Sequence, residues 1–270
     1  MHFGRARAHS CHRIVGALIA LLALRPAGSA LPTRPNIVYV LADDVGWGDY
    51  TPWARTSKVH APTIEGLARD GTVFTRAYAP ASVCAPSRYA LLTGNDCHRA
   101  QEPFGQWNFP STAPQVMPGQ RTLGALLQSA GYTTAFVGKW HLGGGYGKRA
   151  HPARAPHGPL ESGFNRSLWL PLGIQRAPLA FLHDDVNRAQ MRVVGKRPAW
   201  LPVPERLPCE AYARADWAAA ALPRLAWVRE VGPCLASVAA GMLRSMPEPF
   251  FLKYSSQAAH APFQPPATVP

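Results

Sequence analysis

The sequence is short of several features that define whole classes of proteins. No apolar run reaches the ~18 residues that a membrane-spanning helix needs, which excludes a multi-span membrane protein. The five cysteines include no Cys-x-x-Cys pair and no zinc-type spacing with histidine, and the chain has no internal repeat and no low-complexity tract. Charged residues make up only 16% of the chain and hydrophobic residues 47%, which is a globular composition. The 28 prolines argue against a helical bundle.

Acidic residues are also scarce. The chain has 15 acidic and 28 basic residues, which gives a net charge of +13. Such a surplus favours anionic partners such as nucleic acid, acidic glycans or small anions. The lysines and arginines are scattered and form no runs, so we do not expect nucleic acid to be the partner.

The N-terminus has the pattern of a secretory signal peptide. Residues 1–13 are basic, residues 14–24 are apolar but too short to span a bilayer comfortably, and small residues follow at 28–30. The pattern predicts a signal peptide over residues 1–30 and a mature domain over residues 31–270. The protein would then be extracellular or lysosomal. An ordinary buried helix is the alternative interpretation.

An oxidising compartment would allow disulfides and glycosylation. Cys11 would leave with the signal peptide, so Cys84, Cys97, Cys209 and Cys234 could form up to two disulfides, with the pairing left open. Asn165 begins the single Asn-x-Ser/Thr sequence and is a candidate glycan acceptor.

The hydropathy pattern alternates between strands and helices. An apolar run at residues 36–41 predicts a buried strand, and Gly131 ends a helical pattern at residues 122–130. Further patterns predict a helix at residues 63–70 and strands at residues 73–78, 133–137 and 250–255. This alternation indicates an α/β fold with a mostly parallel central sheet flanked by helices.

The middle of the chain lacks a sustained period. Residues 143–208 are rich in Pro, Gly and Arg, and we expect long surface loops there, with one short strand at 191–194. Residues 212–246 are rich in alanine and predict helix, broken near Pro223 and at Gly232-Pro233.

Four polar clusters follow the expected strands or lie where loops meet helices. They are Asp43-Asp44, the segment 84–88, the segment 139–141 and His260. Because functional residues of parallel sheets gather beyond the carboxyl ends of the strands, we expect these clusters to meet at one edge. Two carboxylates, a thiol and several cations suit a hard metal ion and an oxyanion substrate.

These clusters resemble the signatures of the sulfatase family. Residues 84–94, Cys-Ala-Pro-Ser-Arg-Tyr-Ala-Leu-Leu-Thr-Gly, are similar to the family sequence C-x-P-S-R followed by L-T-G. Residues 131–143 resemble the second sulfatase signature, residues 34–49 its opening strand with Asp43-Asp44, and residues 250–263 the block that contains His260. The resemblance runs from about residue 35 to residue 270. It implies the alkaline-phosphatase-like fold of the secreted arylsulfatases.

The resemblance also implies catalytic roles. In sulfatases the cysteine that matches Cys84 becomes Cα-formylglycine through a formylglycine-generating enzyme, and the hydrated aldehyde attacks sulfur. Arg88 would stabilise the formylglycine, and Lys139 and His141 would hold sulfate where negative charge grows. His260 would contact sulfate and the leaving oxygen as a candidate general acid.

A single Ca²⁺ is the implied cofactor. Asp43, Asp44 and the formylglycine oxygen at Cys84 would bind it, because hard cations prefer oxygen ligands. Taken alone, each residue has an ordinary interpretation: a turn or cap for the aspartates, a buried thiol for Cys84, and surface or structural positions for the histidines and Lys139.

The sequence departs from the family pattern in three places. The Asp-Asn pair and later lysine that complete the family's site have no candidate before Pro270, so we expect the N-terminal portion of a truncated catalytic domain. Leu172-Gly173 stands where some arylsulfatases place a serine, and Asn95-Asp96-Cys97 where a basic residue is common.

Three functions remain open from the sequence. The first is a sulfuric ester hydrolase that cleaves an aryl or carbohydrate sulfate, possible substrates including sulfated glycans. The second is a formylglycine-dependent phosphonate or phosphate monoester hydrolase. The third is a truncated, inactive sulfatase-like protein that binds sulfated anions.

Overall fold

The computed structural model describes about three fifths of the chain. The described residues are 34–51, 56–103, 105, 107, 113–143, 158–173, 182–184, 192–194, 197–199 and 224–260. The expected signal peptide and Cys209 lie outside these ranges. Contacts divide the chain into residues 1–35 and residues 36–270, and the fold below is that of the second unit. No helix in the described part is both long and apolar enough to cross a bilayer.

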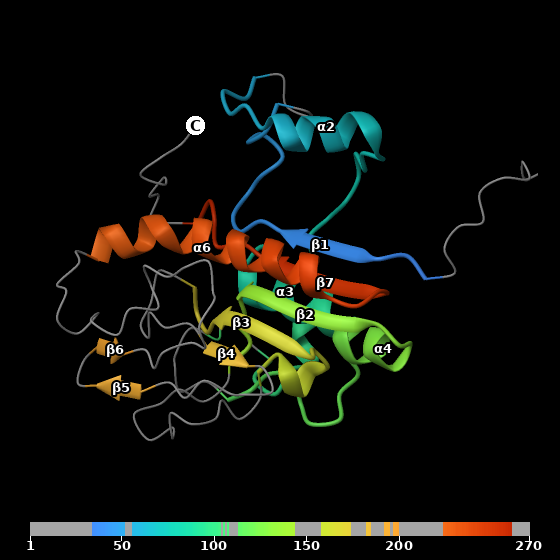
Figure 1. Ribbon diagram of the computed structural model, residues 1–270, viewed down its shortest axis with the longest axis vertical. Helices are drawn as coiled ribbons and strands as arrows, with labels where there is room; N and C mark the ends of the chain where they lie inside the picture. Colours follow the sequence, from blue (N-terminus) through green and yellow to red (C-terminus); the bar gives the residue numbers. More distant parts are fainter. Residues whose placement is uncertain are drawn as a thin grey trace, which may run out of the picture. The chain divides into compact units, whose positions relative to one another are not determined.

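A five-stranded sheet forms the centre of the fold, in the order β1-β7-β2-β3-β4 (Figure 1). Strands β1 (Ile37–Leu41), β7 (Phe250–Ser255), β2 (Thr133–Lys139) and β3 (Arg166–Leu170) are parallel, and β4 (Leu182–Asp184) pairs antiparallel with β3. Strands β5 (Arg192–Val194) and β6 (Arg197–Ala199) form a separate antiparallel pair. The expected mostly parallel α/β sheet is confirmed.

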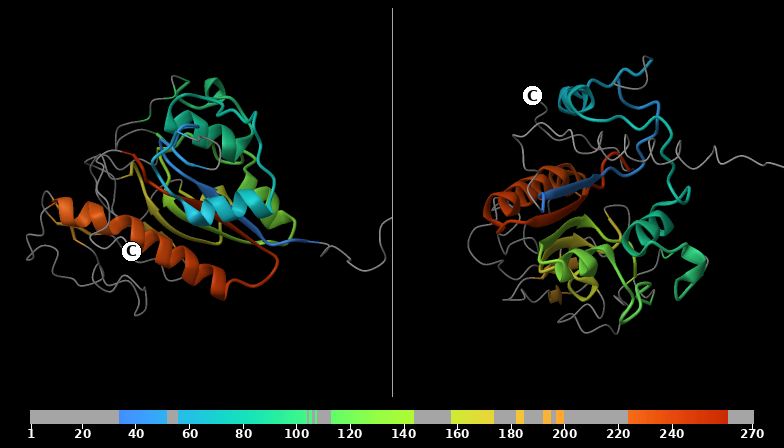
Figure 2. Two further views of the ribbon diagram at one scale, coloured as in Figure 1. Left: turned by 90° about the horizontal axis from the view of Figure 1, so that it is seen from above. Right: turned by 90° about the vertical axis from the view of Figure 1, so that its right-hand side faces the viewer.

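Helices cover both faces of this sheet. Helix α6 (Arg224–Ser245) lies on one face, and α3 (Cys84–Thr93) and α4 (Leu123–Ser129) lie on the other (Figure 2). Helix α2 (Pro62–Asp70) has no buried residue, and the short 3₁₀ helices η1 (Cys97–Arg99) and η2 (Leu160–Ser162) complete the described elements.

Side chains of β2 alternate between the two faces of the sheet, so this strand contributes to the hydrophobic core on each face. Ala135 and Val137 point to the α6 face, where they pack with Leu235 and Val238. Phe136 points to the opposite face and meets the rings of Trp140 and Phe164 edge-on, with centroids 5.2 and 5.4 Å away. The buried sheet therefore holds the ends of β1, β2 and β7 in fixed positions.

Most of the expected elements are present. The structure confirms helices near residues 63–70 and 122–130 and strands at 36–41, 133–137, 191–194 and 250–255. Two expectations about strands were wrong. Residues 73–78 form no strand, and Phe74 and Tyr78 are exposed. Strand β3 lies in the segment expected to be loop, because Leu168, Trp169 and Leu170 are buried beside β2.

Helix α6 does not break at Gly232-Pro233 as expected. It continues through Pro233, which is exposed, while Val231, Leu235, Val238 and Met242 are buried against the sheet. Burying such side chains contributes about 1.5–3 kcal/mol each, which outweighs the ~3 kcal/mol that an interior proline costs. Residues 200–223, which include the expected break near Pro223, lie outside the described ranges.

Strand β1 also differs from the expected buried strand. It lies at the end of the strand order, and its valines Val38 and Val40 are 48% and 64% exposed. Val38 is in register with Leu252, and Val40 with Tyr254. Both partners on β7 pack in the core beneath α6, so the two valines lie on the same face of the sheet as that helix. Only the opposite face of β1, with Ile37 and Tyr39, packs into a core.

Candidate active site

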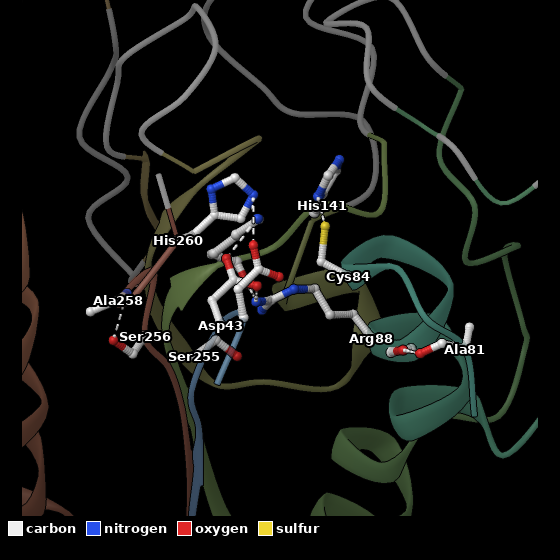
Figure 3. A network of polar contacts seen from close by, with 12 residues as sticks. Asp43, Ala81, Cys84, Arg88, His141, Ser255, Ser256, Ala258 and His260 are labelled. Carbon is white, nitrogen blue, oxygen red and sulfur yellow. Dashed lines mark hydrogen bonds and ion pairs between the residues drawn. The ribbon is translucent and has the colours of Figure 1, made fainter. Parts of the chain in front are cut away.

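The polar clusters of the sequence meet at the carboxyl edge of the sheet (Figure 3). Asp43 follows β1, His141 follows β2 and His260 follows β7, while Cys84 is the first residue of α3. The three strands are parallel and adjacent, so their ends lie together. Two of the residues there, Asp44 and His141, have left-handed backbones with φ of 56° and 59°. Such conformations in residues other than glycine cluster at functional sites.

Asp43 is the anionic centre of the buried network. Its side chain is 3% exposed, and its two carboxylate oxygens lie 3.0 Å from Arg88 Nη2 and 2.7 Å from Lys139 Nζ. Burial alone would raise the pKa of Asp43, but the positive charges of Arg88 and Lys139 outweigh it and hold the pKa below its ordinary value. Asp43 is therefore ionised at neutral pH.

Arg88 connects helix α3 to the ends of two strands. Its Nη2 donates to Asp43 and its Nη1 donates to the Lys139 carbonyl oxygen at 2.9 Å. The buried Nε has no hydrogen-bond partner among the described residues. A buried donor without a partner is costly, so this atom is suited to an additional acceptor at the site.

Cys84 and His141 face each other across the site. The Cys84 Sγ lies 3.3 Å from His141 Nδ1. Burial lowers the pKa of His141 to about 3, with further contributions from the charges of Lys139 and Arg88. The imidazole is therefore neutral at working pH. The position of Cys84 at the start of α3 also places it at the positive end of the helix dipole.

Asp44 and His260 form the outer part of the site. His260 Nε2 lies 3.4 Å from Asp44 Oδ2, and the Asp44 side chain is 58% exposed whereas His260 is 21% exposed. The His260 backbone N–H donates to the Gln257 carbonyl oxygen at 3.0 Å, which positions the histidine after β7. Asp44 is thus the carboxylate of the pair that remains accessible from outside.

The three expected metal ligands, Asp43, Asp44 and Cys84, point in different directions and do not form one compact group. Asp43 is turned toward Arg88 and Lys139, Asp44 toward His260, and Cys84 toward His141. Asp43 and Asp44 still offer adjacent carboxylate oxygens at one strand end, which is the donor chemistry that Ca²⁺ prefers. The two carboxylates therefore fit a hard cation in chemical type and supply only part of its shell.

A different group does bring three potential ligand atoms together within the described residues. Asp96, Cys97 and His98 have ligand atoms within 4.8 Å of one another. Capping accounts for this cluster, because Asp96 accepts the His98 backbone N–H at 3.0 Å at the start of η1. Burial and the hydrogen bond that the thiol donates to the Asp96 carboxylate raise the pKa of Cys97, so its thiol stays protonated.

Lys253 is the residue that sequence reasoning missed. It lies inside β7, and its side chain is 3% exposed. Its Nζ donates to Ser255 Oγ at 3.2 Å and lies 5.1 Å from the centroid of the Tyr39 ring. The signal was available as a single lysine within the apolar strand Phe-Phe-Leu-Lys-Tyr-Ser, because lysine is almost never fully buried.

The cysteines and the candidate glycan acceptor are the remaining residues that the sequence singled out. Cys84 and Cys97 are free thiols, and Cys234 is disulfide-bonded. Asn165 is exposed, and its side-chain oxygen accepts the Thr134 backbone N–H at 2.9 Å. Its exposure leaves the glycan expectation open.

Known proteins resemble both the sequence and the fold. The family model described as Sulfatase matches residues 35–168. The chain is 28% identical over 261 residues to N-acetylgalactosamine-6-O-sulfatase of Bacteroides thetaiotaomicron, covering 85% of this chain and 49% of that protein. It is 36% identical over 170 residues to human arylsulfatase A, covering 61% of this chain and 31% of that protein.

Solved structures agree with the sequence matches. A sulfatase structure from a study of glycosaminoglycan metabolism by Bacteroides thetaiotaomicron superposes with a TM-score of 0.66 at 26% identity, covering 87% of this chain and 53% of that one. The PsFucS1 sulfatase of Pseudoalteromonas sp. superposes with a TM-score of 0.56 at 20% identity, which shows the fold alone. The chain spans about half the length, or less, of the relatives it matches.

Proposed function

The chain belongs to the sulfatase family through residues 35–168, and we propose that it carries the nucleophile half of a site that hydrolyses sulfuric esters. The observation that carries this proposal is the contact of Cys84 with His141, at 3.3 Å, beside the buried network of Arg88, Asp43 and Lys139. That arrangement places a modifiable side chain next to fixed cations, which is what a reaction on an anionic ester requires.

Formylglycine at Cys84 is the nucleophile we propose. When formed, this group supplies a hydrated aldehyde oxygen, a nucleophile that ordinary side chains cannot provide. Cys84 is a free thiol at the start of α3, so the residue to be converted is not held in a disulfide. A formylglycine-generating enzyme is the maturation partner that this proposal requires.

The other residues would bind and orient the ester. The Nε–H group of Arg88 has no acceptor among the described residues, so it can donate a hydrogen bond to an oxygen of the ester. His141 is neutral, so it can donate or accept one hydrogen bond beside the nucleophile without adding charge. His260 lies at the outer side, against Asp44, where it can hold a proton for the leaving alcohol.

Calcium is the cofactor we propose for the two adjacent carboxylates. Asp43 and Asp44 would hold the ion, which when bound supplies positive charge to polarise sulfate oxygens. Asp43 is already ionised by its contacts with Arg88 and Lys139, so no proton has to leave it on binding. A Ca²⁺ shell of six to eight oxygens needs further ligands beyond these two.

The substrate class follows from charge and from the relatives. The net charge of +13 favours an anionic substrate, and one relative is named for N-acetylgalactosamine 6-O-sulfate. We therefore propose an aryl or carbohydrate sulfate as substrate and the secretory pathway as the location.

Replacement of Cys84 tests the nucleophile. The full chain would be produced together with a formylglycine-generating enzyme, and conversion at residue 84 would be read by peptide mass spectrometry. We expect Cys84→Ala to abolish hydrolysis of p-nitrophenyl sulfate, a loss of at least ~10³-fold, because no other side chain replaces the nucleophile. Ser87→Ala, one turn away on α3, is the matched control and should keep most of the activity. Turnover in Cys84→Ala would overturn the mechanism.

Two comparisons separate the alternatives. Rates on p-nitrophenyl sulfate and p-nitrophenyl phosphate distinguish a sulfatase from a phosphate monoester hydrolase, because the leaving group is the same. Sulfate and calcium binding without turnover, at full conversion of Cys84, would identify a chain that binds sulfated anions and does not hydrolyse them.

A further inference from the structure

Lys253 lies in the layer of side chains directly below the candidate site. It is one inward-facing position before Ser255 on β7, and the register places it beside Tyr39 of β1 and Phe136 of β2. Its ammonium group points toward Ser255 Oγ, 3.2 Å away, and therefore toward the carboxyl edge of the sheet. The positive charge of Arg88, on helix α3, is close enough to lower the pKa of the lysine.

The buried charges in this region do not balance. Among the described residues, the buried charged side chains are Arg88, Lys139 and Lys253 on the positive side and Asp43 on the negative side. Both oxygens of Asp43 are bonded to Arg88 and Lys139, so Lys253 has no carboxylate of its own. Ser255 Oγ is the one hydrogen-bond acceptor that the described residues give its three N–H donors.

An unbalanced buried cation is stable only where an anion can approach or where the proton can leave. Building on the proposed function, we propose that Lys253 is a positioning residue of the anion site: when protonated, it adds a second buried positive charge to that of Arg88, and this charge strengthens the binding of a sulfate group. Loss of this proton weakens the binding without removing any group that touches the anion.

The charge of Lys253 can change within the working pH range. Burial, together with a smaller contribution from the positive charge of Arg88, lowers its pKa to about 7. Bound sulfate would oppose both effects, so binding above pH 7 would be accompanied by proton uptake. The lysine and the anion are therefore thermodynamically linked.

The other groups that face Lys253 do not produce the same step. Burial raises the pKa of Tyr39, which stays neutral, and Asp43 stays ionised. His141 stays neutral because its pKa is about 3. His260 lies against Asp44 on the outer side of the site, 3.4 Å from its carboxylate.

The test compares three side chains at position 253 in the full chain. Binding of inorganic sulfate would be measured by isothermal titration calorimetry between pH 6 and 9, in buffers of different ionisation enthalpy. We expect the affinity of the wild type to fall about tenfold over this range and its binding at pH 8 to take up a proton. Lys253→Arg keeps a permanent charge and should bind tightly throughout. Lys253→Met keeps the apolar stem and should bind weakly throughout, with no proton uptake from this site.

The difference between the Arg and Met variants assigns the pH-dependent step to the side chain at position 253. Near-ultraviolet circular dichroism would confirm that each variant is folded, and Lys253→Gln replaces Lys253→Met if the latter is not. The proposal is wrong if the Arg and Met variants bind sulfate alike, or if the Met variant keeps the proton uptake of the wild type. Because sulfate binding is measured without turnover, an inactive chain would contradict the proposed function and leave this test intact.

Discussion

At the scale of single residues, the site depends on one carboxylate that compensates two cations. The Asp43 carboxylate accepts hydrogen bonds from Arg88 and from Lys139, and all three side chains are buried. Removing one member of such a group leaves the others charged in a medium that solvates them poorly. A charge that looks dispensable in the sequence therefore supports the whole edge of the sheet.

We expect Asp43→Asn to lower the free energy of unfolding by about 3–5 kcal/mol, because it leaves two buried cations uncompensated. Urea unfolding followed by tryptophan fluorescence would measure it. Asp44→Asn is the matched control: Asp44 is 58% exposed, so its loss should change stability by less than about 1 kcal/mol. Equal effects of the two substitutions would contradict the role given to Asp43.

The lowered pKa of buried Lys253 predicts that the free energy of unfolding rises with pH. Its folded pKa of about 7 lies below the ordinary value of 10.5, so the unfolded chain binds the proton more strongly between these values. Below pH 7 the folded protein bears the full cost of burying the charged lysine, and this cost disappears as the pH rises toward 10.5. We expect Lys253→Met to stabilise the protein by a few kcal/mol at pH 6.5 and by much less at pH 10. Denaturant titrations at the two pH values would measure this, and an equal gain at both would contradict it.

At the scale of elements, local patterns predict what local forces determine. Helix α4 begins where Thr122 caps it, with its oxygen accepting the Ala125 N–H at 3.0 Å, and this signal is visible in the sequence. The candidate site was predictable for the same reason, since its residues follow strands or begin a helix. Residues 73–78 alternate like a strand but pair with none in the described part of the chain.

Tertiary packing decided the elements that local patterns missed. Strand β3 is short and lies in a segment rich in proline and glycine, and it is a strand because β2 pairs with it. The α6 helix continues across Pro233 because its buried side chains hold both halves on the sheet. Lys253 was overlooked because its importance depends on Arg88, which is 165 positions away in the sequence.

The continuous α6 helix gives a prediction at the same scale. Pro233 is exposed and has no intrahelical N–H, so Pro233→Ala should stabilise the protein by about 1–3 kcal/mol. Thermal unfolding would measure the gain. Ala236→Gly, on the exposed side of the same helix, should lower stability by about 1 kcal/mol. An unchanged melting temperature in Pro233→Ala would show that the helix already accommodates the proline.

At the scale of the whole molecule, β1 forms one edge of the sheet and carries exposed apolar side chains. Within the described residues no strand pairs with its outer side, and Val38 and Val40 extend the apolar α6 face beyond the helix. Unpaired, apolar edge strands associate with one another.

We expect Val40→Lys to reduce self-association, because a charge on an edge strand opposes pairing with another chain. Analytical ultracentrifugation and light scattering across a range of concentrations would measure it. Val59→Lys adds the same charge at a residue that is 51% exposed and outside the sheet, and it should have little effect. Equal reductions by both substitutions would point to net charge rather than to the edge of β1.

The position of β7 has a consequence for the timing of synthesis. It lies between β1 and β2 although it is made after both, so the centre of the sheet cannot close until β7 has been synthesised. From Cys84 to the end of β7 at Ser255 there are 255 − 84 = 171 residues. At the usual rate of translation, these take roughly 10–30 s. During that interval Cys84 belongs to an open chain, which is the period in which a modifying enzyme could reach it before His141 and the sheet enclose it.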